Sequence, residues 1–160
     1  MTLKRTSRRD TERLWQLLLL HRDQPRSREA LAVLLWPEVQ AQKARFNLRF
    51  HLHQLQSHLP DTSDEQRWIV GDRDRIGWNP KASAWLDIAA FDGARRDGLA
   101  LLATSPAGAD ERLTVALSLY RADLLADAQD EWLDDPRNEY RVRVVEVAEA
   151  LISLREHALR

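Results

Sequence analysis

Five apolar residues recur at helical spacing between positions 44 and 59, and they constrain the fold more than any other feature of the chain. Separated by four, four, three and four positions, they are Ala44, Leu48, Leu52, Leu55 and Leu59. At about 100° per residue they fall within a sector of about 80°. The spacing predicts a helix over residues 40–59 that packs one narrow face against neighbouring elements.

Two shorter helices are predicted before this one. The first covers residues 10–21. It follows basic residues 1–9, which lack periodicity and are expected to be a disordered arm or a truncated end. The second begins after Ser27, a good N-cap residue, with Glu29 in its first turn. It ends at Trp36, because Pro37 disfavours a helical conformation for the residue before it.

A β-hairpin is predicted next. Residues 68–70 and 76–78 are β-branched or aromatic apart from one glycine, and turn-forming residues separate them. Three helices followed by a hairpin are typical of a winged helix-turn-helix, in which the third helix enters the major groove of DNA and the hairpin contacts the backbone.

The rest of the chain is predicted to be helical. Residues 85–87 form a short extended piece, and helices follow over residues 88–103, 110–120 and 135–158, the last with Asp135 as its cap and Pro136 in its first turn. The predicted inward faces hold Phe91, Leu99, Leu113, Leu117, Tyr120, Tyr140, Val144, Val147, Leu151 and Leu154. The fold class is therefore mainly α, with a domain over residues 1–86 and antiparallel helices of the kind that repeat proteins stack over residues 87–160.

The charge divides along the chain. Residues 1–60 hold 11 lysines and arginines against 5 acidic residues, whereas residues 61–160 hold 13 against 20. The two parts have net charges of +6 and −7. This division favours binding of a polyanion by residues 1–60, whereas residues 61–160 are expected to be solvated or to bind protein.

Several kinds of chemistry have no support in the sequence. There are no cysteines, and His51 and His53 would point about 200° apart on a helix, so no metal site is expected. Phosphate-binding glycine motifs and a strained nucleophile turn are absent. We expect no cofactor, no enzymatic activity and no membrane span, in a cytoplasmic protein. The six tryptophans are predicted to pack, with stacking on single-stranded bases as the alternative.

The outer faces of the third helix, the hairpin and the start of the second helix supply the candidate DNA-binding residues. Arg45, Asn47 and Arg49 are predicted to contact bases, because their side chains can bond to purine edges. The predicted phosphate contacts are Arg28, Lys43, Arg73 and Arg75. His53 is a further outward residue of the third helix and completes the candidate set.

Several segments resemble the Streptomyces antibiotic regulatory protein family, in order and spacing. They are residues 27–32 with 34–37, residues 43–45 and 47–49 with Leu52 and Leu55, residues 87–91, residues 119–127 and residues 131–133. The resemblance implies a response-regulator-type winged helix followed by a partial bacterial transcriptional activator domain of tetratricopeptide-like helices. It also implies an activator that binds duplex DNA, often as side-by-side protomers, and that engages RNA polymerase.

Phe46 and Phe50 support a different interpretation. They point nearly opposite the apolar stripe, on the face expected to meet DNA. An exposed apolar patch at this position is typical of a protein-interaction or dimerisation module of a larger regulator. The sequence therefore leaves two partners open, duplex DNA or another protein such as a second copy of the chain.

Overall fold

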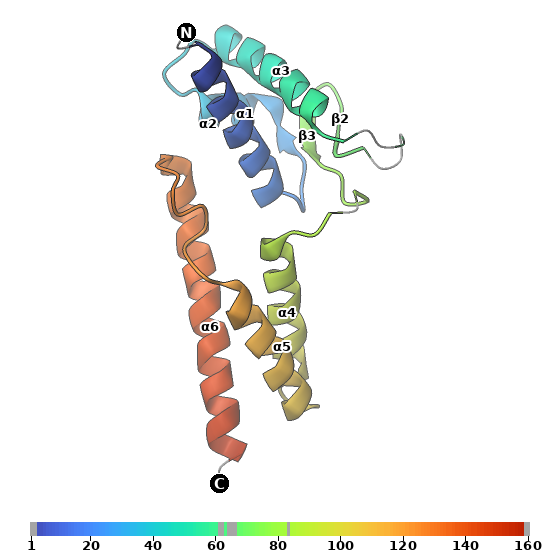
Figure 1. Ribbon diagram of the computed structural model, residues 1–160, viewed down its shortest axis with the longest axis vertical. Coiled ribbons are helices and arrows are strands. Elements are labelled where there is room, and N and C mark those ends of the chain that lie inside the picture. The colour runs from blue at the N-terminus through green and yellow to red at the C-terminus, as the bar shows by residue number, and fades with distance from the viewer. Residues whose placement is uncertain (1–2, 61–62, 64–66, 83, 159–160) are drawn as a thin grey trace. The chain divides into compact units, whose positions relative to one another are not determined.

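The computed structural model describes residues 3–60, 63, 67–82 and 84–158. The chain divides into two compact units, Met1–Ser83 and Ala84–Arg160 (Figure 1). The described residues are mainly helical, with one small antiparallel sheet of three strands. The mainly α fold class predicted from the sequence is confirmed.

The first unit combines helices with short strands. In chain order its described elements are α1 (Leu3–Leu20), β1 (Arg26–Ser27), α2 (Arg28–Leu35), α3 (Ala41–His58), β2 (Ile69–Gly71) and β3 (Arg75–Trp78). β3 lies in the middle of the sheet and pairs antiparallel with both other strands. The predicted hairpin is confirmed. The sequence does not predict β1, because two residues are too few to show an alternating pattern.

The helix α1 begins earlier than predicted. The basic residues before Asp10 continue the helix back to Leu3, so the expectation of a disordered arm is wrong for residues 3–9. Arginine and lysine are good helix formers, and no glycine or proline interrupts this segment. Arg8 and Glu12 also form an ion pair one turn apart, with 3.0 Å between Nε and Oε1. Residues 1 and 2 of the predicted arm lie outside the described residues.

The apolar stripe predicted for α3 forms the centre of the first unit's core. Its members Ala44, Leu48, Leu52 and Leu55 are buried. They pack with buried leucines of α1 and α2, which are Leu14, Leu17, Leu18, Leu31 and Leu35. Each fully buried leucine stabilises the fold by about 1.5–3 kcal/mol. This packing fixes which side of α3 faces outward.

The tryptophans pack largely as predicted. Trp78 is buried, and its ring lies 5.2 Å from that of Trp15 and 5.5 Å from that of Trp68, centroid to centroid. Trp85 is the exception, because its side chain is 73% exposed in the segment that joins the two units. The predicted extended piece at residues 85–87 is also partly wrong, since α4 begins at Asp87.

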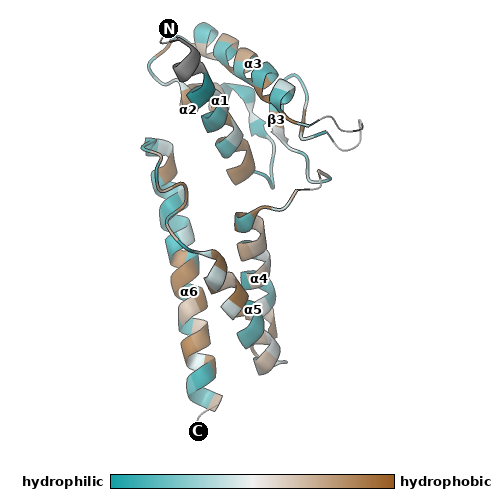
Figure 2. Ribbon diagram, in the orientation of Figure 1, coloured by the Kyte–Doolittle hydropathy of each residue, from teal (hydrophilic) through white to brown (hydrophobic). Residues whose placement is uncertain are grey.

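The second unit is a helical unit with a 3-10 turn, η2. Its described elements are α4 (Asp87–Leu101), α5 (Pro106–Leu119), η2 (Glu131–Leu133) and α6 (Asp134–Ala158). Its core includes Phe91, Leu113, Tyr140, Val147 and Leu151. Figure 2 shows hydrophilic and hydrophobic residues alternating along α6, as expected of an amphipathic helix.

Three details of this unit differ from the prediction. The helix α5 begins at Pro106, four residues before its predicted start at residue 110. Leu117 is 38% exposed, because α5 turns Ala109, Leu113 and Ala116 inward instead. The last helix begins at Asp134, directly after the 3-10 turn, so Asp135 lies in its first turn and is not its cap.

Acidic residues of the second unit bind arginines on neighbouring helices. Arg143 Nη1 lies 2.8 Å from Asp92 Oδ1, which joins α6 to α4, and Arg155 Nε lies 2.7 Å from Asp110 Oδ1, which joins α6 to α5. Some of the acidic residues in the negatively charged part of the chain, residues 61–160, are therefore paired with arginines within the unit.

The long connection between α5 and α6 is held by arginines of α6. Arg137 donates hydrogen bonds to the carbonyl oxygens of Leu124, Leu125 and Ala128, at 2.9, 2.6 and 2.8 Å. Leu125 has a φ of 48°, a left-handed conformation that costs free energy in a residue other than glycine. In the same connection, the Arg141 guanidinium and then the Tyr120 hydroxyl lower the pKa of Asp123 to about 2.

Candidate nucleic-acid interface

The start of α2 and the hairpin turn are joined by hydrogen bonds. The Ser27 side chain caps α2 by accepting from the backbone N of Ala30 at 3.4 Å. Arg28 donates from its backbone N to Asp74 O at 2.8 Å and from its Nε to Asp72 O at 3.0 Å. Helix and turn therefore present one continuous surface.

The hairpin turn is itself ordered by Asp72. Its Oδ1 accepts from the backbone N of Asp74 and of Arg75, each at 2.8 Å. The bond from Arg75, then that from Asp74, lowers the pKa of the Asp72 carboxyl, and nearby arginines lower it further. Asp72 is therefore an anion at neutral pH, and it fixes the turn that carries Arg73.

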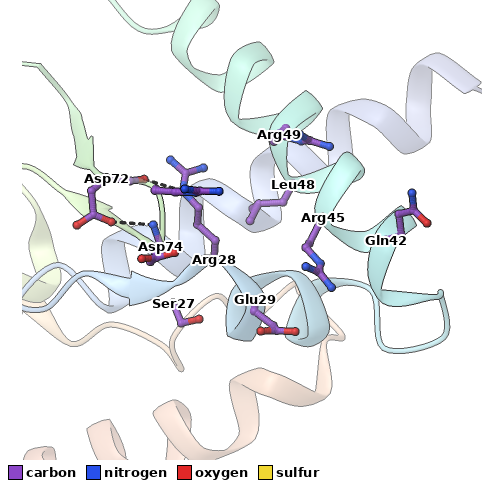
Figure 3. Close-up of a pocket in the computed structure, with 10 residues that line it drawn as sticks. Ser27, Arg28, Glu29, Gln42, Arg45, Leu48, Arg49, Asp72 and Asp74 are labelled. Carbon is purple, nitrogen blue, oxygen red and sulfur yellow. Dashed lines mark hydrogen bonds between the residues drawn. The ribbon is translucent and has the colours of Figure 1, made fainter.

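An open groove of about 880 Å³ lies between α2, α3 and this turn (Figure 3). Its charged lining residues are the arginines Arg28, Arg45, Arg49 and Arg73 and the acidic residues Glu29, Asp72 and Asp74. Gln42 lies at the α3 side of the groove, and Ser27 at the start of α2. The cations exceed the anions by one, so the groove is weakly cationic.

The outward side of α3 is cationic over its first half, between residues 43 and 49. Lys43, Arg45 and Arg49 are all exposed, and α3 contains no acidic residue. Within the described residues, none of these three side chains forms an ion pair. Their charges are therefore available to an anionic partner.

The structure brings together half of the eight predicted site residues. Arg28, Arg45, Arg49 and Arg73 line the groove. The other four lie outside its lining: Lys43 and His53 are exposed on α3, Asn47 is half-buried on α3, and Arg75 is exposed at the start of β3. Asn47 is thus the least accessible of the three predicted base contacts.

Sequence reasoning missed the acidic residues of the groove. Asp72 and Asp74 alternate with Arg73 and Arg75 in the hairpin turn. This alternation is visible in the sequence, but the turn's contact with the start of α2 depends on the pairing of β1 with β3. Glu29 was predicted only as a helix-dipole residue, and it also lines the groove.

His51 belongs to the core of the first unit. Its Nδ1 lies 2.9 Å from Thr11 Oγ1 on α1, and its ring stacks on Trp36 with centroids 5.4 Å apart. Asp10 Oδ2 lies 3.8 Å from His51 Nε2 and accepts a hydrogen bond from Trp36 Nε1 at 3.2 Å. Burial lowers the pKa of His51, and the Asp10 charge opposes this only in part.

The residues that the structure describes contain no group of three or more side chains of the metal-ligating types His, Cys, Asp and Glu placed to hold an ion. Over the same part of the chain, each helix is too short or too polar to cross a membrane.

The second unit matches a known family. Residues 86–158 match the family model of the bacterial transcriptional activator domain. No curated protein and no solved structure matches the chain. The family match supports the resemblance noted in the second half of the sequence, and it indicates a transcriptional role of the activator type in a bacterium.

Proposed function

We propose that the chain is a DNA-binding transcriptional regulator whose first unit is a winged helix-turn-helix that recognises duplex DNA with α3. The outward side of α3 carries this proposal. It presents Lys43, Arg45 and Arg49 to solvent, without an acidic residue on the helix and without an ion pair among the described residues. Such a surface attracts the phosphate backbone and can donate to base edges.

The order of elements supports the same assignment. Three helices, with a short strand after the first, are followed by a hairpin whose second strand completes the sheet. This order is typical of winged helix-turn-helix domains. The 18 residues of α3 correspond to a length of about 27 Å, which exceeds the roughly 12 Å width of the major groove. The helix can therefore reach phosphates on both sides of the groove.

Each candidate residue has a role in this proposal. Arg45, Arg49 and the less exposed Asn47 contact base edges. Phosphate contacts come from the remaining cations of the set, Arg28, Lys43, Arg73 and Arg75, with His53 at the edge of the interface. The Nε of Arg28 is occupied by Asp72, but within the described residues its Nη atoms form no hydrogen bond.

The second unit has the supporting role. We propose that it contacts RNA polymerase or a second copy of the chain, as the family match and the wider resemblance suggest. The chain then acts by binding, and no catalytic step is assigned to it.

The test is a salt titration of binding to a random-sequence duplex of 24 base pairs, measured by fluorescence anisotropy. If about five phosphates are neutralised, log K falls with log salt concentration at a slope of about −4 to −5. Replacing Arg45 and Arg49 together by alanine should abolish binding. The matched control replaces Arg112 and Arg121 by alanine, because these exposed arginines of the second unit carry the same charge. Unchanged affinity in the Arg45 and Arg49 variant would refute the proposal.

A further inference from the structure

We propose that Phe46 and Phe50 recognise thymine methyl groups in the major groove and so determine the base preference of α3. This inference rests on the proposed function, because it assigns a specificity to the same helix. It concerns two residues that the predicted set of polar contacts leaves without a role.

The two phenylalanines occupy the outermost line of α3. Their side chains are 61% and 44% exposed, respectively. Each lies two residues from the buried Leu48, which at about 100° per residue is about 160° around the helix. Phe46 and Phe50 are also one turn apart, so they lie next to each other on the helix surface. A helix that docks with its outward face in a groove therefore brings this pair closest to the bases.

The chemistry of phenylalanine limits what it can contact there. Its side chain neither donates nor accepts a conventional hydrogen bond. The distinctive apolar group that the base pairs present in the major groove is the C5-methyl of thymine, whereas guanine presents two acceptors at the same depth. A phenylalanine placed over guanine would desolvate those acceptors without replacing their hydrogen bonds. The pair therefore favours thymine and disfavours guanine.

The spacing of the pair matches the spacing of bases. Residues four apart on a helix have Cβ atoms about 5–6 Å apart. Bases on one strand are about 3.4 Å apart along the axis. The two rings therefore suit two methyl groups about two base steps apart.

The surroundings of the pair favour DNA over a protein partner. Phe46 and Phe50 lie between the cations Arg45 and Arg49 on one flank and Lys43 on the other, all exposed. Charged residues are depleted in the centre of protein interfaces, which bury about 800 Å² per partner. Two apolar rings flanked by cations are therefore better suited to DNA, a polyanion with methyl groups in its major groove, than to a protein partner.

The experiment uses the full chain and three versions of one random-sequence pool of 24-base-pair duplexes. The first contains thymine, the second contains uracil in its place, and the third contains uracil together with 5-methylcytosine. Uracil lacks only the methyl group, and 5-methylcytosine returns a methyl to the same groove position on another base. The chain is expected to bind the thymine pool about tenfold more tightly than the uracil pool, from two buried methyl groups. The third pool should recover most of this affinity.

Variants assign the effect to the pair. Replacing Phe46 and Phe50 by alanine should reduce the thymine-to-uracil ratio to about one while salt-dependent binding persists. The control replaces Val142 and Ile152, which are exposed apolar residues of α6, by alanine. This control should keep the wild-type thymine-to-uracil ratio.

Three results would overturn the inference, and they are distinguishable. Equal affinity of the wild-type chain for the thymine and uracil pools, with salt-dependent binding intact, overturns it and leaves the proposed function standing. Failure to bind any duplex overturns both. A drop from dimer to monomer mass in light scattering, caused only by the phenylalanine variant, shows that the pair is a protein interface instead.

Discussion

The Nε atom of Arg28 donates a hydrogen bond of 3.0 Å to the carbonyl oxygen of Asp72. This bond joins the first residue of α2 to the hairpin turn, and the backbone bond from Arg28 to Asp74 runs beside it. Two elements that are 44 residues apart in the chain are thereby held as one wall of the groove. In the proposed interface they approach the DNA backbone together.

Replacing Arg28 should therefore loosen the hairpin turn. In Arg28→Met the side-chain bond to Asp72 is lost, which costs about 1 kcal/mol, and amide hydrogens of the turn should exchange about fivefold faster. Arg28→Lys keeps the charge but lacks the planar guanidinium. It should therefore keep the attraction to phosphates, while the amide hydrogens of the turn still exchange faster than in the wild type.

The control for this prediction is Arg26→Met on β1. Arg26 is exposed, and within the described residues its side chain has no partner. Exchange in the turn should then stay at the wild-type rate. Equal protection in the Arg28→Met and Arg26→Met variants would show that the side-chain bond does not order the turn.

The buried ring of His51 predicts a dependence of stability on pH. Burial lowers the pKa of His51 in the folded chain, and Asp10 opposes this only in part, while the unfolded chain keeps a value of about 6.5. The unfolded state therefore binds more protons, and stability is lost as the pH falls below about 6.5 towards the lower folded value. Thermal unfolding measured between pH 8 and pH 5 should show this loss.

Two histidine variants isolate the effect. His51→Gln should remove the part of the pH dependence that lies just below pH 6.5, although it lowers stability at every pH because the contacts with Thr11 and Trp36 are disturbed. His53→Gln changes an exposed histidine of the same helix and should keep the wild-type profile. If His51→Gln and the wild type lose stability in parallel, His51 is not the responsible group.

The sequence predicts those parts of the fold that depend on local periodicity. The stripe from Ala44 to Leu55 is buried as its spacing requires, and Ser27 caps α2. Contacts between distant segments are not encoded in this way. The bond from Arg28 to Asp72 and the stacking of His51 on Trp36 join segments that are far apart in the chain. Because the first of these contacts brings the acidic hairpin turn to α2, the sequence does not predict the mixed charge of the groove.

Helix faces built from small residues were also difficult to predict. The buried face of α5 consists of Ala109, Leu113 and Ala116, whereas the more hydrophobic Leu117 is exposed. Alanine contributes little to an apolar pattern, but it allows neighbouring helices to approach closely. Gly98 of α4 has the same function opposite Leu113. A prediction that weights residues by hydrophobicity therefore places Leu117 on the buried face of α5, where the structure has the alanines.

Two glycines of α4 give a matched pair of opposite predictions. A Cβ atom at Gly98 would lie 2.7 Å from both Cγ and Cδ2 of Leu113 and 3.1 Å from its backbone N, whereas a Cβ atom at Gly93 would have nothing within 4 Å. Gly98→Ala should destabilise the second unit by about 1–3 kcal/mol through overpacking between α4 and α5. Gly93→Ala should stabilise it by about 0.5–1 kcal/mol, because alanine loses less conformational entropy in a helix. Urea denaturation followed by circular dichroism measures both changes in the free energy of unfolding. Stabilisation by both substitutions would mean that α4 and α5 do not make the close contact at Leu113.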